Sequence, residues 1–454
     1  MATCHGFDWA PADGGNYDLS TAYLSRRSGP ISEADDPYTL PANSTCTSGY
    51  TPVAYVAEAR FLPGIDDVGY NADIVKQAVM DYGVIYCNMY FDSDYMNYSD
   101  ETYYYDGSDG TNHGVAIVGW DDNKVVTGGI STPSSTGAWI IKNSWGPSWG
   151  ESGFFYISYE DTEALSSVAY FPSHIDYNSS SEVYHYDELG AVTAIGYSDG
   201  DDYGLVKYVA SDNQQITMLG SYINDAGTSL TIEVYDNFSG GVLSGLLGTT
   251  GVQTCTYPGY YTYELATPIN ISSSDDFYVR ARYNSGENFP VPAEYAYADY
   301  SMGMVMETGN CWVSSNGSSW TEIGGTTGSD YDLCIKAYAV DVASAPPVAD
   351  FSADATVVTV DQTVYFTDAS SGIPDNWVWT FEGGTPASST SLNPTVSWSA
   401  PGTYDVTLYV SNAKGNDEIT KYDYITVTSA PTTCEYHQNV DDATDNVVYY
   451  TAGN

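Results

Sequence analysis

The sequence predicts an α+β segment followed by two all-β sandwiches, and three observations support this fold class. In the first 172 residues, the stretch from Asn71 to Tyr82 spaces its apolar residues as a helix does. Residues 173–341 lack helical periodicity and consist of short β-rich runs separated by Gly, Asn, Asp and Ser. A proline-containing linker at 344–347 precedes a third segment, in which apolar and polar residues alternate. A length of 454 residues also fits about three domains.

The composition is that of a folded, acidic protein. Hydrophobic residues make up 43% of the chain and 44 residues are tyrosines, far more than a disordered chain carries. Asp and Glu number 59 against 12 Lys and Arg, and the net charge of −47 repels nucleic-acid phosphates and anionic membrane surfaces. No run of about 18 apolar residues occurs, so no membrane span is expected. We therefore expect a secreted protein that binds no nucleic acid.

Residues 111–159 hold the candidate functional site. His113 opens one apolar run, Val115 to Val118, and Asn143 lies at the end of a second run, Ala138 to Ile141. If these runs are neighbouring strands, they bring an imidazole and a carboxamide face to face, as a general base held in one orientation requires. Taken alone, such a pair is more simply explained as the polar ends of two buried strands. The surrounding residues favour the functional interpretation.

These surrounding residues form a long motif. His113 to Trp120 read HGVAIVGW, and Trp139 to Phe154 read WIIKNSWGPSWGESGF. The pattern resembles the C-terminal half of the papain-like cysteine peptidases. In that family His-(Ala/Gly)-Val-x-x-Val-Gly-(Tyr/Trp) carries the catalytic histidine, and an Asn-Ser-Trp-Gly segment carries the orienting asparagine. More than a dozen positions agree in type and spacing, and weaker agreement at 13–16 and 36–46 extends the resemblance over about residues 1–172.

The resemblance implies a fold and a set of roles. Residues 1–172 would form part of a papain-like catalytic domain, mainly its β-rich second lobe. His113 would be the catalytic histidine, held in orientation by the side-chain oxygen of Asn143. The residues implied in support or in substrate binding are Gly14, Gly15, Asn112, Gly114 and Trp145. Trp145 would shield the hydrogen bond between the catalytic pair, and the other four would line the cleft for the substrate's P2 residue.

The nucleophile of that family is missing from this chain. A papain-like peptidase attacks with a cysteine thiolate in a Gly-x-Cys-Trp type segment, about 130–150 residues before the histidine. No such segment is present, and Cys4 is followed by Gly6-Phe7-Asp8-Trp9 rather than by a helix-forming run. The resemblance implies a structural Cys4 paired with Cys46. Without a signal peptide or an inhibitory pro-segment, the sequence is interpreted as a fragment that lacks activity as it stands.

The remaining cysteines and histidines indicate no metal or cofactor. Seven cysteines leave one thiol without a partner in an oxidising compartment. Cys311 and Cys334 are the second expected disulfide, Cys87 is expected to be a buried thiol, and Cys255 and Cys434 are not assigned. Five scattered histidines, without Cys-x-x-Cys or His-Glu-x-x-His spacing, argue against a metalloenzyme.

The second segment, residues 173–341, resembles the lectin-like domain that follows the catalytic domain in bacterial members of this family. The residues that carry this resemblance are 231–235 (TIEVY), 314–320 (SSNGSSW) and 334–337 (CIKA). Sugar binding would require Tyr and Trp rings on one exposed face, and the simpler alternative is that these rings form the core. The resemblance nevertheless makes extracellular glycans candidate partners.

The third segment, residues 348–429, resembles a polycystic kidney disease (PKD) domain, a small immunoglobulin-like sandwich. The resemblance rests on residues 349–351, 364–368, 377–384 and 402–412. In the last of these, Tyr404, Val406, Leu408 and Val410 alternate with polar residues, as in a half-buried strand. Such modules are spacers or adhesion units. Residues 430–454 are interpreted as a truncated acidic tail.

Two classes of function remain open at this stage. The first is a secreted papain-like cysteine endopeptidase that cleaves proteins or peptides without a cofactor and is attached by its sandwiches to a bacterial cell surface or its glycans. The second is a non-catalytic extracellular binding or adhesion protein that keeps a peptidase-like lobe. An in-frame cysteine segment ahead of the first codon would distinguish the first class from the second.

Overall fold

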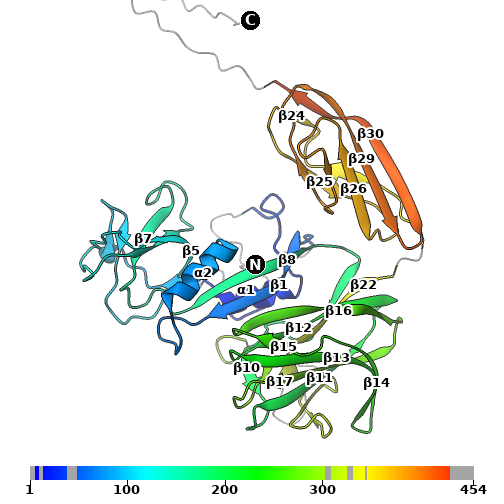
Figure 1. Ribbon diagram of the computed structural model, residues 1–454, viewed down its shortest axis with the longest axis horizontal. Coiled ribbons are helices and arrows are strands. Elements are labelled where there is room, and N and C mark those ends of the chain that lie inside the picture. Colours follow the sequence, from blue (N-terminus) through cyan, green and yellow to red (C-terminus); the bar gives the residue numbers. More distant parts are fainter. Residues whose placement is uncertain are drawn as a thin grey trace, which may run out of the picture. The chain divides into compact units, whose positions relative to one another are not determined.

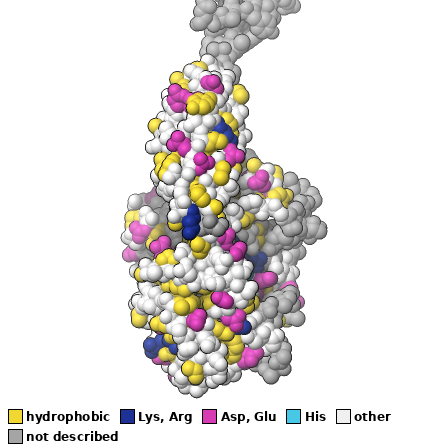
Figure 2. Space-filling view, turned by 90° about the vertical axis from the view of Figure 1, so that its right-hand side faces the viewer, with side chains coloured by type: hydrophobic (Ala, Val, Ile, Leu, Met, Phe, Trp, Pro, Cys, Tyr) yellow, Lys and Arg dark blue, Asp and Glu magenta, His cyan; other side chains and the backbone are white. Residues whose placement is uncertain are grey.

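The computed structural model describes residues 6–9, 14–37, 49–301, 308–324, 331–342 and 345–429 (Figure 1). The chain divides into two compact units, Met1–Asp341 and Val342–Asn454. Strands dominate both units. Within the described ranges, no helix combines the length and the apolar character needed to cross a membrane. On the face drawn in Figure 2, acidic side chains are scattered among uncharged ones and do not gather in one patch.

The peptidase-like part of the first unit contains two helices and a curved run of strands. Its elements are α1 (Tyr17–Ser25), β1 (Ala54–Leu62), α2 (Ala72–Tyr82), β2 (Ile85–Met89), η1 (Ser93–Tyr95), β3 (Met96–Asn97), β4 (Thr102–Tyr103), β5 (His113–Asp121), β6 (Ala138–Lys142), β7 (Phe154–Ser158) and β8 (Val168–Asp176). Helix α2 confirms the predicted helix; the Asn71 side chain caps its start, and Gly83, at φ 87°, ends it.

Helix α1 is absent from the sequence-based prediction. Asn16 caps it, because its side-chain oxygen accepts the N–H of Leu19 at 2.8 Å. The helix buries Leu19, Ala22 and Tyr23, and its apolar stripe is short and irregular. Such a helix is stabilised by the surface against which it packs more than by its own pattern, so periodicity alone does not reveal it.

The sandwich in the first unit is all-β, as predicted. Its strands are β9 (Ser181–Tyr184), β10 (Thr193–Ile195), β11 (Asp201–Val209), β12 (Gln214–Ile223), β13 (Thr228–Ser239), β14 (Val242–Thr249), β15 (Gln253–Cys255), β16 (Gly259–Ile271), β17 (Asp276–Asn284), β18 (Val291–Tyr295), β19 (Cys311–Ser314), β20 (Thr321–Glu322), β21 (Tyr331–Leu333) and β22 (Ile335–Asp341). One sheet has the order β14-β13-β17-β11-β19-β20 with β15 beside β13, and it faces β12, β16 and β22.

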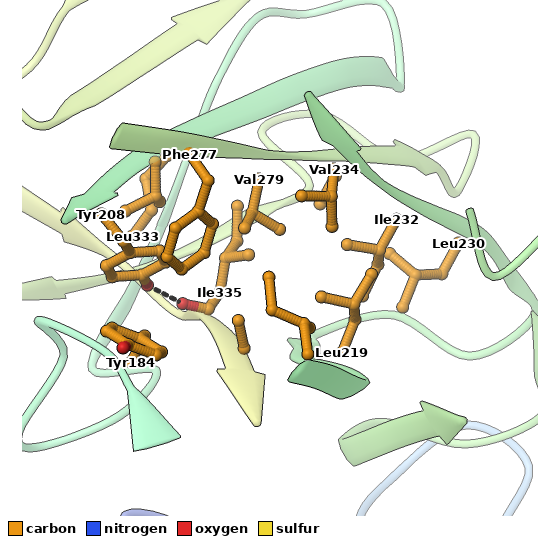
Figure 3. Close-up of a cluster of buried hydrophobic side chains, with 14 of the residues drawn as sticks. Tyr184, Tyr208, Leu219, Leu230, Ile232, Val234, Phe277, Val279, Leu333 and Ile335 are labelled. Atoms are coloured by element: carbon orange, nitrogen blue, oxygen red, sulfur yellow. Dashed lines mark hydrogen bonds between the residues drawn. The ribbon is translucent and has the colours of Figure 1, made fainter. Parts of the chain in front are cut away.

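The core of this sandwich is aliphatic in its middle and aromatic at one end (Figure 3). Leu219 of β12 lies opposite Ile232 of β13, with Val279 and Ile335 beside them. At the aromatic end, Tyr208 and Phe277 are fully buried, and the Tyr208 hydroxyl donates to the Ile335 carbonyl. These rings therefore form core and do not belong to an exposed sugar-binding face.

The peptidase-like part and the sandwich share one sheet of twelve strands. Its order is β3-β4-β7-β6-β5-β2-β8-β1-β16-β12-β22-β9, and the junction is the antiparallel pair of β1 with β16. At this junction Ala59 faces Tyr260 and Arg60 faces Gly259. Gly259 has φ +143°, and a Cβ there would lie 2.1 Å from the Ala59 carbonyl oxygen, so only glycine fits. The expected boundary at 172/173 falls inside β8, which pairs with both β1 and β2.

The expected Cys311–Cys334 disulfide does not form. Both thiols are free and buried. Cys311 lies on β19 in the seven-stranded sheet, with its sulfur 3.9 Å from an Asp332 carboxylate oxygen, whereas Cys334 precedes β22 in the twelve-stranded sheet and packs in a separate cluster. The two sulfurs therefore belong to different layers. Cys87 is buried as expected, and the expected Cys4–Cys46 pair lies outside the described residues.

The second unit is a small two-sheet sandwich, as the sequence predicts. Its strands are β23 (Phe351–Ala353), β24 (Val357–Thr359), β25 (Val364–Asp368), β26 (Asn376–Phe381), β27 (Ser388–Ser389), β28 (Thr395–Val396), β29 (Gly402–Asn412) and β30 (Gly415–Thr428). The sheets have the orders β24-β30-β29-β26-β27 and β23-β25-β28. Val406, Leu408 and Val410 of β29 are buried, and Trp379 and Trp398 fill the centre of the core.

A buried ion pair lies where the sandwich meets the peptidase-like part. The Lys336 ammonium contacts the Asp187 carboxylate, and the two side chains are 1% and 0% exposed. The ammonium also donates to the Asp187 backbone carbonyl at 3.3 Å. Breaking such a pair leaves one charge buried without a partner, which is costly in a medium of low polarity.

We expect Lys336→Ala to lower the free energy of unfolding by about 3–5 kcal/mol, because it leaves the Asp187 carboxylate buried and unpaired. The matched control is Lys207→Ala, which removes a more exposed ion pair with Asp276 and should cost less than about 1 kcal/mol. Urea unfolding followed by circular dichroism measures both. Equal losses in the two variants would contradict the importance of the buried pair.

Glu294 on β18 makes stability depend on pH. Its side chain is fully buried and accepts the N–H groups of Glu188 at 3.0 Å and Leu189 at 2.8 Å. Burial, with a smaller contribution from the charge of Asp187, raises the pKa of Glu294 from 4.5 to about 8. Because folding raises this pKa, the protonated form stabilises the fold. That stability is complete below pH 4.5 and is lost as the pH rises through 8.

We therefore expect the urea concentration at the midpoint of unfolding to decrease as the pH is raised from 5 to 9. Glu294→Gln should make this decrease smaller, because glutamine has no proton to lose. The comparison concerns the slope with pH, since the substitution also changes the hydrogen bonds to Glu188 and Leu189. Glu264→Gln, at an exposed position on β16, should keep the slope of the unchanged protein. An unchanged slope in Glu294→Gln would refute the assignment.

Candidate active site

The two residues singled out by the motif meet where two interior strands of the twelve-stranded sheet start and end. His113 is the first residue of β5, and Asn143 directly follows the last residue of β6. These strands are antiparallel neighbours with Ala116 opposite Lys142, so the start of one lies beside the end of the other. Nε2 of His113 lies 2.9 Å from Oδ1 of Asn143, within hydrogen-bonding distance.

The backbone around Asn143 determines which atoms of the pair face each other. Oδ1 of Asn143 also accepts the N–H of Ser144 at 2.8 Å, and a backbone N–H requires an oxygen, so the oxygen and not the amide nitrogen faces the ring. An oxygen only accepts, so Nε2 of His113 carries the proton. Nδ1 is then the ring atom available to exchange a proton with a reacting group.

Trp145 shields this pair from one side. Its ring stacks on the His113 imidazole with centroids 4.8 Å apart and planes 25° from parallel. Asn143 is only 6% exposed, whereas Trp145 is 44% exposed and forms the outer cover. A hydrogen bond kept from water is stronger and holds the ring in one orientation, as a positioned acid–base group requires.

Phe91 and Trp149 support the cover, and the sequence analysis did not identify them as part of the site. Phe91 meets the Trp145 ring edge to face at 4.7 Å, and Trp149 does so at 5.0 Å. Asn112 holds Phe91 in place, because its Oδ1 accepts the Phe91 N–H at 2.7 Å and its Nδ2 donates to the Phe91 carbonyl at 3.0 Å. The sequence predicts Asn112 beside the substrate's P2 residue. In the structure both polar atoms of its side chain bind the backbone of Phe91. Trp149 lay within the quoted motif, but no local pattern marks Phe91.

Of the three expected glycines, Gly114 directly follows His113 on β5. A Cβ on Gly114 would lie 3.0 Å from the Tyr86 ring, so glycine lets this ring cover the strand next to His113. Tyr17 of α1 approaches the Tyr86 ring, with centroids 6.0 Å apart. Gly14, at φ +90°, and Gly15 immediately precede the cap of α1. The aromatic contact therefore connects the start of α1 to Gly114.

The cysteines that the structure describes do not supply a nucleophile. Cys87, Cys255, Cys311 and Cys334 are all buried. Burial raises the pKa of each of these thiols, which disfavours the reactive thiolate. Cys4, Cys46 and Cys434 lie outside the described residues. Within the described ranges, no three His, Cys, Asp or Glu side chains gather as a metal site would require.

We expect iodoacetamide to leave the four buried cysteines unmodified in the native protein and to modify them once urea unfolds it, because the reagent needs an accessible thiolate. Mass spectrometry of the tryptic peptides measures each site. A cysteine introduced at the exposed position Ser272 serves as the reactive control. Rapid modification of Cys87 in the native protein would contradict its burial on β2, next to β5.

Comparison with known families matches all three segments in order. The model of the papain family of cysteine proteases matches residues 1–172, the lectin-like domain model matches 183–339, and the PKD domain model matches 344–427. We call residues 1–172 the papain-family segment, because they match the model of that family. The motif that runs from His113 through Trp145 lies within this segment.

Curated relatives align with the papain-family segment alone. Vignain from Phaseolus vulgaris is 30% identical over 171 residues, which cover 37% of this chain and 43% of that protein. A cathepsin B-like cysteine proteinase from Caenorhabditis elegans is 28% identical over 125 residues, or 27% of this chain and 34% of that protein. The chain thus spans less than half the length of these relatives.

Solved structures extend the likeness into the lectin-like domain. The clostridial cysteine protease Cwp84 after propeptide cleavage is 21% identical, covers 75% of this chain and 86% of its own, and has a TM-score of 0.66. The cysteine protease and lectin-like domains of Cwp84, a surface layer associated protein of Clostridium difficile, give 0.64 with 75% and 77% coverage at 21% identity. The papain-family segment and the lectin-like domain thus share the fold of these proteins.

Proposed function

We propose that the papain-family segment provides the acid–base half of a cysteine endopeptidase site, which cleaves proteins or peptides. The observation that carries the proposal is the hydrogen bond of 2.9 Å between His113 and Asn143 beneath the stacked Trp145 ring. Such an imidazole, fixed by a carboxamide and kept from water, has the geometry for repeated proton transfer at Nδ1. The match of residues 1–172 to the papain-family model supports this chemistry.

In the proposed reaction a cysteine thiolate attacks the scissile carbonyl, and His113, protonated at both ring nitrogens, donates the Nδ1 proton to the leaving amine. The neutral ring then takes a proton from the water that hydrolyses the thioester. Asn143 accepts from Nε2 throughout and keeps Nδ1 directed at the reacting atoms. Gly15 would offer its backbone to the substrate, since a side chain there would block the approach. The thiolate comes from outside the residues that the structure describes.

The test uses the full gene product that contains these residues. We expect it to hydrolyse a fluorogenic dipeptide substrate, and His113→Ala to lower kcat/KM by about 10⁶-fold, because the proton-transfer group is lost. Asn143→Ala should lower it by a smaller factor, on the order of 10⁴ or less, since the imidazole remains but its orientation does not.

The matched control is His174→Ala, which removes an exposed histidine of β8 and should leave kcat/KM unchanged. Circular dichroism confirms that each variant is folded. Activity that survives His113→Ala would refute the assignment of His113. A product without any peptidase activity would favour the alternative, in which the segment is a non-catalytic unit of a surface protein.

We further propose that the protein acts outside the cell, at a bacterial cell surface, and that its lectin-like domain attaches it to a glycan. The match of residues 183–339 to the lectin-like family and the shared fold with a surface layer associated protein support this placement. The PKD domain would act as a spacer. On this view the functional segments are 1–172, 173–341 and 348–429, followed by the tail at 430–454.

A further inference from the structure

A pocket of about 260 Å³ lies where the papain-family segment meets the lectin-like domain. Helix α1 ends at Ser25, and the next two residues, Arg26 and Arg27, line the pocket. The rest of the lining comes from the turn at residues 179–180, from the start of β9 at 181–183, and from Gln214 and Asp341. Gln214 and Asp341 face each other as the first residue of β12 and the last of β22. The pocket thus depends on both segments of the chain.

Two carboxylates on one wall are held in fixed positions. Gln214 is 2% exposed, and its amide nitrogen donates to Glu182 at 3.0 Å and to Asp341 at 2.8 Å. Its oxygen accepts from the Tyr184 hydroxyl, so this amide is fully oriented. Each carboxylate uses one oxygen here, and its second oxygen has no hydrogen-bond partner among the residues that the structure describes. The wall therefore offers two free acceptors.

The pocket lining also contains hydrogen-bond donors. The Arg27 guanidinium packs over the rings of Tyr177 at 4.8 Å and Tyr55 at 5.5 Å, and its Nη2 donates to the Asn178 carbonyl at 2.6 Å. Its Nη1 has no acceptor within the described part of the chain. Ser179 is exposed at the mouth of the pocket and adds a hydroxyl. The guanidinium is thus held in place, and the N–H groups of Nη1 remain available to a ligand.

We propose that this pocket binds one neutral sugar residue of a glycan, a proposal that rests on the glycan attachment proposed above. An anion would be repelled by Glu182 and Asp341, and a cation by the two arginines. A hydroxyl group both donates and accepts, so neighbouring hydroxyls of a sugar satisfy the guanidinium and the carboxylates together. The volume lies just below the range of about 300–1,000 Å³ typical of larger ligands, which suits a single ring.

The test is saturation-transfer NMR and calorimetry on the full chain with glucose, galactose, mannose and N-acetylglucosamine as probes. We expect at least one of these neutral sugars to bind. Ser179→Phe should weaken binding at least tenfold, because the ring fills the mouth of the pocket from an exposed position that the fold does not need. Asp341→Asn should also weaken it, since it removes a charged acceptor. Ser272→Phe, at an exposed turn between β16 and β17, should leave binding unchanged.

The outcomes distinguish the sugar pocket from the proposals of glycan attachment and of peptidase activity. Sugar binding that Ser179→Phe leaves intact would overturn the pocket but keep glycan attachment. Binding of glucuronate or acetate in place of the neutral sugars would overturn the proposed ligand class. No binding of any probe would overturn both the pocket and glycan attachment. None of these results bears on the peptidase proposal, which is tested by hydrolysis.

Discussion

The pairing of β1 with β16 is the constraint on which the first unit depends. It joins eight strands of the papain-family segment to four of the lectin-like domain in one sheet, and Gly259 permits it because a side chain there would strike the Ala59 carbonyl. Arg60 strengthens the junction, since its guanidinium donates to the Tyr260 carbonyl at 2.8 Å and lies 3.4 Å above the Tyr261 ring. Two segments that match different family models thus form one compact unit.

The same unit holds a charged pair in its interior. Lys336 and Asp187 lie between layers that bury them almost completely, and each is the other's hydrogen-bonding partner. Charges of this kind stabilise little by themselves, because desolvation offsets most of their attraction. They do, however, penalise any arrangement that separates them.

Helix α1 connects the glycine pair to the polar pocket. Gly14 and Gly15 precede its first turn, and Arg26 and Arg27 follow its last. A helix of nine residues is short and stiff, so its position relative to the lectin-like domain also sets the position of the glycine pair.

The sequence by itself determined the class of each segment, the helix from Ala72 to Tyr82 and the meeting of His113 with Asn143, because these follow from local periodicity and from a long motif on adjacent strands. Only the tertiary structure decided the role of Asn112 in holding Phe91, the separation of Cys311 from Cys334, the helix α1 and the polar pocket. Each of these depends on contacts between residues far apart in the chain. Such contacts are set by how layers pack, and no local pattern of residue types records them.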